Sequence, residues 1–237
     1  MTWYKVLDKW GQSCHKGNAK YSLPKDGPGD WMSPVEGELW MCRNGYHLVD
    51  EEHLVEWLTV DGVVYIAEPG IETRGPGFGG KLCCRTVRLL KRIGETSEKM
   101  LQLLACDYAE HVLHIYEKVY PWDLRVRNCI ETIRRLIHGE VTQEEFDAAW
   151  DGAGDAIYAA WADKNATRDV IEGWNIESAA IAARAAWGLY ECDRAPRVAL
   201  NVAHDARKAT RAISRKTWYV EEEWQTKKLF EYLGGGI

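Results

Sequence analysis

Alanine is distributed so unevenly that the chain divides into two parts. Residues 1–94 contain two alanines and residues 95–237 contain twenty-two, whereas 13 of 21 glycines and 5 of 7 prolines lie before residue 95. Glycine and proline punctuate sheets with turns, and alanine favours helix. The sequence therefore predicts an α+β protein with two domains, 1–94 and 95–237. A small antiparallel sheet domain with one helix is followed by an all-α bundle of about six helices.

In the first part, short apolar runs alternate with turn signals such as Asn44-Gly45, which is the pattern of a small sheet. The expected strands are Leu39–Cys42, Val63–Ala67 and Leu82–Leu90. One helix is expected after Asp50, which can cap its N-terminus and is followed by Leu54, Trp57 and Leu58 on one face.

In the second part, the apolar period changes to that of helices. The first stripe runs from Leu101 to Val119 and ends before Pro121, and Thr142 with Glu145 forms a capping box at the start of a later helix. The expected helices lie at about 101–119, 123–137, 142–161, 178–190, 198–213 and 218–233. Alanine at their contact positions allows the helix axes to approach closely.

A glycine-rich segment, residues 75–81, has the G-x-x-x-x-G-K spacing of a phosphate-binding loop. It lacks the hydroxyl residue after the lysine, and the following residues favour a strand instead of a helix. A connection between two strands is the simpler interpretation, and a loop that receives an anion without hydrolysing it is the alternative. The candidate ligand-binding residues are Arg43, His47, Arg74, Lys81 and Arg85.

The net charge of −6 belongs to residues 95–237, which carry 18 Lys/Arg against 24 Asp/Glu. This balance argues against strong nucleic-acid binding, which needs a basic face. With no membrane span and seven cysteines in no secreted-type pattern, we expect a cytoplasmic protein with reduced thiols. We expect no cofactor, no metal and no catalytic set, and a homo-oligomer stays open.

Two polar groups stand on the first two expected helices. Asp107, His111 and His114 share one side of a helix, where a surface or interface role is favoured over metal binding. The arginines of the next helix lie near acidic residues, so ion pairs within the bundle are expected. They are Arg125, Arg127, Arg134 and Arg135.

Both parts resemble families. The segment Cys42-x-x-Gly45-Tyr46-His47 resembles a small domain of unknown function in phage and bacterial proteins; the resemblance covers about residues 3–93 and implies a phage or prophage origin. About residues 100–212 are similar to the bacterial putative immunity protein family, most specifically in Pro121-x-Asp123-x-Arg125-x-Arg127. That resemblance implies a protein that neutralises a toxin by binding it.

The chain departs from the immunity family by an insertion at Lys164–Trp174 and by tryptophans in place of small residues, which puts the family's partner in question. These tryptophans are the candidate partner-binding residues, because tryptophan often anchors protein interfaces. They are Trp161, Trp174 and Trp187.

Three functions remain open. The favoured one is a non-enzymatic, phage-encoded binding or inhibitory protein, anti-defence or immunity-like, that occupies a host protein in the host cytoplasm. The alternative is sequestration of a small nucleotide-type signalling molecule, since bases stack on aromatic side chains and phosphates prefer arginine and glycine-loop amides. The second alternative is a transferase that uses His47 with a carboxylate such as Glu68 in the N-terminal domain.

Overall fold

The computed structural model describes residues 1–15, 17–77, 79–166, 195–211 and 215–234. The described residues form an antiparallel six-stranded sheet followed by helices, so the protein is α+β. The chain folds into two compact units. Unit 1 comprises Met1–Ser97 and Leu229–Ile237, and unit 2 comprises Glu98–Lys228.

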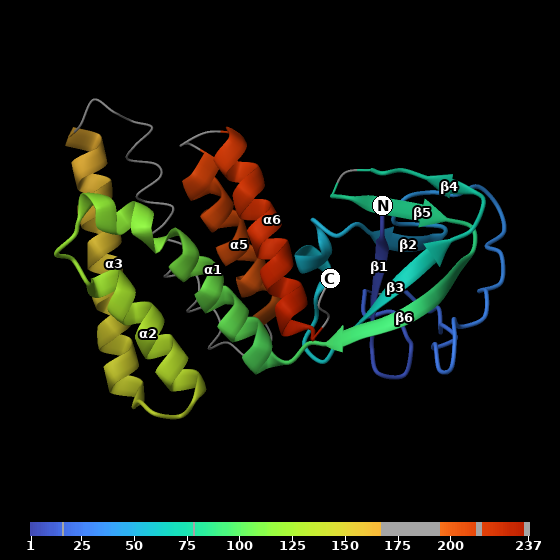
Figure 1. The fold of residues 1–237 in the computed structure, drawn as a ribbon, viewed down its shortest axis with the longest axis horizontal. Helices are drawn as coiled ribbons and strands as arrows, with labels where there is room; N and C mark the ends of the chain where they lie inside the picture. The colour runs from blue at the N-terminus through green and yellow to red at the C-terminus, as the bar shows by residue number, and fades with distance from the viewer. Residues whose placement is uncertain (16, 78, 167–194, 212–214, 235–237) are drawn as a thin grey trace. The chain divides into compact units, whose positions relative to one another are not determined.

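Unit 1 is built on the sheet, whose strand order is β4-β5-β2-β1-β3-β6 (Figure 1). All neighbouring strands are antiparallel. The strands are β1 (Trp3–Leu7), β2 (Tyr46–Val49), β3 (Val63–Pro69), β4 (Thr73–Arg74), β5 (Lys81–Cys84) and β6 (Val87–Glu95).

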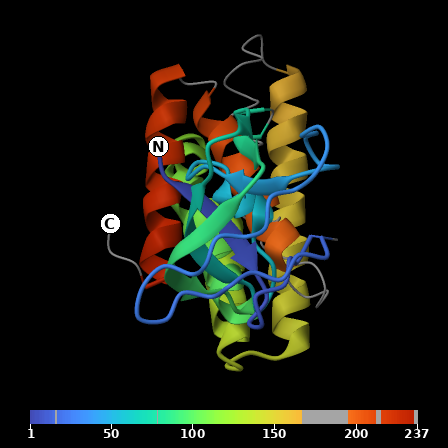
Figure 2. The same cartoon turned by 90° about the vertical axis from the view of Figure 1, so that its right-hand side faces the viewer.

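The segment between β1 and β2 runs across one face of this sheet (Figure 2). Its side chains Tyr21 and Met32 pack on the apolar residues of that face, among them Leu7 and Leu48. Side chains alternate along a strand, so Tyr4 points to the other face, where its ring centroid lies 5.3 Å from that of Phe230. Two parts of unit 1 that are remote from each other in sequence therefore contact opposite faces of the sheet.

Two strand expectations were wrong. Leu39–Cys42 is not a strand, because the carbonyl of Trp40 accepts hydrogen bonds from the backbone N–H groups of Arg43 (3.0 Å) and Asn44 (2.9 Å) and closes a turn. Leu82–Leu90 is two strands, β5 and β6, because the chain between them bonds elsewhere: the Arg85 N–H donates to the carbonyl of Glu72. The expectation at Val63–Ala67 is confirmed by β3.

The single helix expected in this part is only a turn of 3₁₀-helix, η1 (Leu54–Trp57). Asp50 does bond its entry, since the His53 N–H donates to Asp50 Oδ1 at 3.1 Å. Leu54 and Leu58 are buried, which explains the apolar pattern that predicted a longer helix. Residues 75–80 join β4 to β5, so the glycine-rich segment leads into a strand and has no helix to present to a phosphate.

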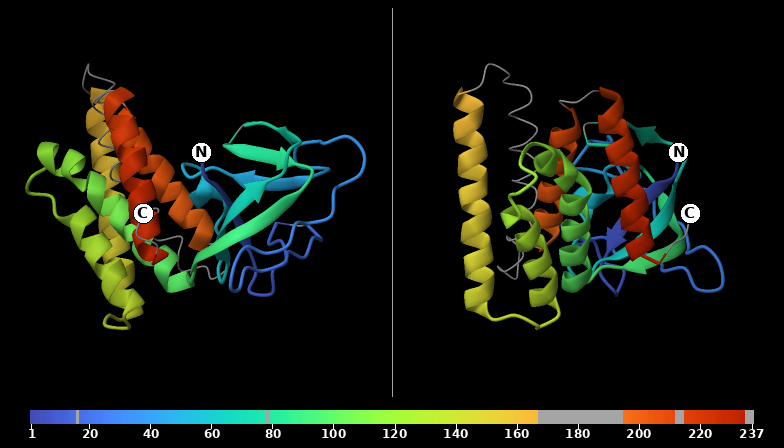
Figure 3. Two further views of the ribbon diagram at one scale, coloured as in Figure 1. Left: turned by 45° about the vertical axis from the view of Figure 1, so that its right-hand side comes forward. Right: turned by 60° about the vertical axis from the view of Figure 1, so that its left-hand side comes forward.

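Unit 2 is helical, and Figure 3 shows α2 and α3 side by side. The helices are α1 (Glu98–Val119), α2 (Arg125–Ile137), α3 (Gln143–Ala166), α5 (Ala195–Arg211) and α6 (Arg215–Tyr232), of which the end of α6 from Leu229 onward belongs to unit 1. Five helices are described instead of about six, because the one expected at residues 178–190 falls in 167–194, outside the described residues. No helix of the described residues is long and apolar enough to cross a membrane.

Most helix signals of unit 2 were local and were confirmed. Leu101, Leu104 and Val112 are fully buried along α1. The capping box forms: the Thr142 N–H donates to Glu145 Oε2 at 2.8 Å, and the Glu145 N–H donates to Thr142 Oγ1 at 3.2 Å. These contacts need only neighbouring residues, which is why the sequence predicts them.

The polar groups of unit 2 are largely paired. Arg127 forms an ion pair with Glu117 at 2.7 Å, and Arg134 contacts Asp107 at 2.5 Å, as expected for ion pairs within the bundle. His111 Nδ1 lies 2.7 Å from the carboxylate of Glu221, which is 2 % exposed. The residues that the structure describes contain no cluster of three or more metal-binding side chains.

Candidate functional site

The sheet opens between β1 and β2. β1 pairs with β3 at five positions and β2 pairs with β5 at four, but β1 and β2 pair only at Tyr4 and Val49. In the gap, Lys5 Nζ donates a hydrogen bond to the carbonyl of His47 at 2.9 Å, so a side chain of one strand takes the role that a backbone N–H would have. The divergence of the strands leaves room for a pocket.

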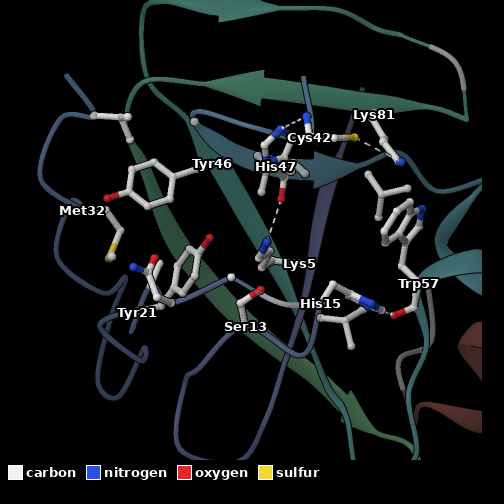
Figure 4. Close-up of a pocket in the computed structure, with 18 of the residues that line it drawn as sticks. Lys5, Ser13, His15, Tyr21, Met32, Cys42, Tyr46, His47, Trp57 and Lys81 are labelled. Carbon is white, nitrogen blue, oxygen red and sulfur yellow. Dashed lines mark hydrogen bonds between the residues drawn. The ribbon is translucent and has the colours of Figure 1, made fainter. Parts of the chain in front are cut away.

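This pocket has a volume of about 900 Å³ and belongs entirely to unit 1 (Figure 4). Residues of β1, β2 and the segment that connects them line it, together with Trp57 of η1 and Lys81 of β5. Figure 4 shows Lys5 and His47 in the middle, with Tyr21 and Tyr46 on one side and Trp57 and Lys81 on the other. The volume lies within the range of small-molecule sites.

The lining is cationic. The described residues of the lining include Lys5, Arg43 and Lys81 and no aspartate or glutamate. Within the described part of the chain, none of these three forms an ion pair: Lys81 Nζ lies 4.0 Å from the ring centroid of Trp57 and 3.7 Å from Cys42 Sγ, and the Arg43 guanidinium lies 4.9 Å from the ring of Trp40. Among the described residues, the cations of the pocket therefore have no carboxylate as an ion-pair partner.

His47 is held in the neutral form. Its Nε2 accepts a hydrogen bond from the Cys42 backbone N–H at 2.7 Å, so the ring proton sits on Nδ1. Burial lowers the pKa of His47, and the charges of Lys5 and Lys81 lower it further. This bond stabilises the turn before β2, in which Cys42 has a φ of 61°.

The lysine at the centre is also perturbed. Burial lowers the pKa of Lys5 to about 8. The alternation of β1 places Lys5 on the same face as Trp3 and Leu7, which are apolar. A charge on an otherwise apolar strand face is the signal by which the sequence could have indicated this residue, and sequence reasoning missed it.

The candidate ligand-binding residues separate into two groups. Arg43, His47 and Lys81 line the pocket. Arg74 and Arg85 do not: Arg74 pairs with Glu38 at 2.7 Å, and Arg85 binds Glu72 with its Nη2 at 2.7 Å and donates to the carbonyl of Gly37 at 3.0 Å. Both arginines connect the segment before β2 to the β4–β5 region, and their assignment as ligand-binding residues stays a prediction.

The carboxylate named in the transferase hypothesis, Glu68, lies outside the pocket that contains His47. Glu68 forms an ion pair with Arg88 at 2.6 Å and does not line the pocket that contains His47. Since His47 Nε2 is already occupied by a backbone N–H, the proposed base and its partner are separately engaged.

The tryptophans expected to bind a partner lie mostly outside the described residues. Trp161 lies on α3, and nothing is described of its side chain. Trp174 and Trp187 lie in residues 167–194, beyond the part of the chain that the structure describes. Their assignment as partner-binding residues stays a prediction.

A different tryptophan is exposed at the corner between α1 and α2, which comprises residues 119–125. Trp122 is 94 % exposed, and the neighbouring Val119 and Leu124 are 40 % and 50 % exposed. These residues surround a shallow hollow whose other walls are Tyr120, Pro121, Asp123, Arg125 and Asn128.

Hydrogen bonds to the carboxylate of Asp123 fix the conformation of this corner. Its carboxylate accepts hydrogen bonds from the Tyr116 hydroxyl (2.7 Å) and from Arg125, whose Nε and Nη2 donate at 2.8 and 2.5 Å and whose backbone N–H donates at 3.1 Å. These bonds lower the pKa of Asp123 to about 2, with the Arg125 side chain as the largest cause. The apolar corner is thus presented on a rigid frame.

One comparison with known proteins finds a similarity. Residues 91–186 match the family described as Imm-5 like putative immunity protein, and the α1–α2 corner lies inside this range. The match supports the resemblance stated for the helical part, while the phage-type resemblance of the first part has no match. No curated protein and no solved structure matches the chain.

Proposed function

We propose that the chain is an immunity-like binding protein that acts by occupying a partner protein, without catalysis. The observation that carries the proposal is the α1–α2 corner: Trp122 is almost fully exposed on a frame fixed by Asp123, and both lie within the residues that match the immunity family. Tryptophan and arginine are the residues that most often dominate binding energy at protein interfaces, and Arg125 lines the same hollow.

Rigidity favours this role. A partner that binds the corner does not have to order it, because four hydrogen bonds to Asp123 already do so. A fully exposed tryptophan gains the most from burial, since nearly all of its surface is still in contact with water. Trp122 would be the anchor, with Leu124 beside it.

In its full form the proposal is a phage-encoded inhibitor, anti-defence or immunity-like, that occupies a host protein in the host cytoplasm. The acidic balance of residues 95–237 favours a partner with a basic surface. Sequestration of a nucleotide-type molecule would use the pocket of unit 1, which is a separate site. A transferase is disfavoured because His47 and Glu68 are engaged with other groups.

The test uses the full chain as bait in a lysate of its host, with bound proteins identified by mass spectrometry. We expect one stoichiometric partner whose affinity falls about 30-fold or more when Trp122→Ala removes the anchor. Tyr158→Ala is the matched control, because Tyr158 is an exposed aromatic residue of α3 in the same unit. Equal losses in the two variants, or the absence of a stoichiometric partner, would contradict the proposal.

A further inference from the structure

The cations of the pocket between β1 and β2 differ in their partners from the arginines of unit 1 that lie outside it. Four arginines of unit 1, namely Arg74, Arg85, Arg88 and Arg92, each bind a carboxylate. The three cations of the pocket bind none among the described residues, and no carboxylate lines the pocket. A group of cations that the fold leaves without acidic partners is suited to an anion from solution.

Lys5 shows this most clearly. Its ammonium offers three donors, and within the described part of the chain one of them is used, by the carbonyl of His47. The ring of Tyr21 lies beneath it, with Lys5 Nζ 5.3 Å from the centroid. Holding an ammonium away from water with two of its three donors unused is costly unless another acceptor reaches it.

The walls on either side of these cations are aromatic. Tyr21 and Tyr46 contact each other edge to face, with centroids 5.8 Å apart, on the side next to Met32. Trp57 forms the other side, under Lys81, and its ring is flanked by His15 at 5.1 Å. Flat aromatic faces next to unpaired cations suit a ligand that has an aromatic ring and a negative group.

The size of the pocket limits that ligand further. A volume of about 900 Å³ is far larger than a phosphate ion needs and is in the range of drug-sized molecules. A polynucleotide strand is disfavoured, because residues 1–94 carry as many acidic as basic residues and the whole chain is negative.

We propose that this pocket binds a free nucleoside monophosphate, with the phosphate at Lys5, Arg43 and Lys81 and the base against the aromatic walls. The phosphate supplies acceptors for the unused donors of Lys5, and the base covers apolar ring surface. The site belongs to unit 1 and lies outside the residues that match the immunity family, so it stands or falls separately from the binding corner of unit 2.

The experiment is calorimetric titration of the full chain with AMP, GMP, CMP and UMP, with their four nucleosides, with inorganic phosphate and with a 5′-phosphorylated tetranucleotide. We expect at least one monophosphate to bind, and its nucleoside and inorganic phosphate to bind about tenfold or more weakly, since each lacks one half of the ligand. A thermal shift that grows with the concentration of the monophosphate would accompany binding.

Variants locate the site. Lys81→Met and Arg43→Met are each expected to weaken binding by roughly 10- to 100-fold, the loss of a charge-assisted hydrogen bond. Arg43 is exposed and can be replaced without disturbing a core. Arg74→Met is the matched control, because Arg74 is an exposed cation of the neighbouring β4 that lies outside the pocket. It should leave the affinity unchanged.

Four results would overturn the proposal. They are no binding of any monophosphate up to about 1 mM, equal affinity for inorganic phosphate, tighter binding of the tetranucleotide than of every monophosphate, and equal losses in the Lys81, Arg43 and Arg74 variants. None of these results concerns Trp122, so failure of nucleotide binding would not contradict the proposed function. In the same way, failure to find a protein partner would not contradict the nucleotide site.

Discussion

Charges in the pocket of unit 1 and at the corner of unit 2 are used in opposite ways. In the pocket, Lys5, Arg43 and Lys81 have no carboxylate partner among the described residues, and aromatic rings lie around them. At the corner, Asp123 and Arg125 are fully paired, and the apolar Trp122 is exposed. At the corner, paired charges hold the backbone that exposes an apolar side chain, whereas in the pocket the proposed ligand would contact the unpaired charges themselves.

The largest loss of stability is expected at Gly45, which lines the pocket. Gly45 has a φ of 130°, and an added Cβ would overlap Cys83 Sγ, whose residue is fully buried. We expect Gly45→Ala to lower the free energy of unfolding by about 3 kcal/mol or more, measured by urea denaturation. The matched control is Gly139→Ala after α2, where φ is 72° and no atom lies within 4 Å of the added Cβ. Backbone strain alone should cost about 1 kcal/mol there, and equal losses would show that Gly45 does not pack tightly.

The comparison of paired with unpaired cations can be tested directly. Arg207 is 9 % exposed and donates to Gln225 at 2.7 Å and to Glu222 at 3.1 Å. Because its removal leaves buried acceptors without a donor, Arg207→Met should cost about 2–4 kcal/mol. Lys81→Met should change the free energy of unfolding by less than about 0.5 kcal/mol. A large loss at Lys81 would mean that this lysine holds the fold, against the division into structural and ligand-binding cations.

Asp123 should make the free energy of unfolding depend on pH in the acid range. Its folded-state pKa of about 2 lies below the ordinary carboxyl value, so its contribution is complete above pH of about 4 and is lost as the pH falls toward 2. After allowance for its partial exposure, the contribution is about 1–2 kcal/mol. Asp123→Asn should remove this part of the acid unfolding curve, followed by tryptophan fluorescence. An unchanged curve would show that the four hydrogen bonds do not stabilise the folded chain.

The smallest effect is expected at His47. Its pKa is lowered in the folded state, so the unfolded chain takes up a proton first as the pH falls below about 6.5, and stability decreases. His47→Gln keeps an acceptor for the Cys42 N–H but cannot titrate. Its free energy of unfolding should fall less between pH 7 and 5 than that of the unaltered protein, by under about 1 kcal/mol. A steeper fall in the variant would reverse the assigned protonation state.

The sequence predicted what depends on near neighbours. The buried stripe of α1 and the Thr142 capping box follow from spacings of three and four residues, and both were confirmed. The strand expected at Leu39–Cys42 was wrong because the chain reverses there in a turn closed by the Trp40 carbonyl, with Cys42 at a positive φ. Strand preference of side chains cannot reveal such a reversal.

Prediction of the candidate sites from the sequence was limited in the same way, because it could not show which residues lie together in the fold. Of the five candidate ligand-binding residues, Arg43, His47 and Lys81 line one pocket, whereas Arg74 and Arg85 lie outside it and form ion pairs. Only the fold shows which cations have acidic partners. Lys5 was missed because it contributes through the separation of β1 from β2, a contact across 42 residues.

Unit 1 is assembled from two stretches of chain separated by the whole of unit 2. Phe230 packs on Tyr4, and Leu233 lies so close to Gly94 that an added side chain there would collide with its backbone. During synthesis, the ribosome makes the sheet first and these covering residues on the order of ten seconds later. During that interval the face of the sheet that carries Tyr4 lacks its contact with Phe230. This face is therefore where a chaperone or a neighbouring nascent chain would bind before folding is complete.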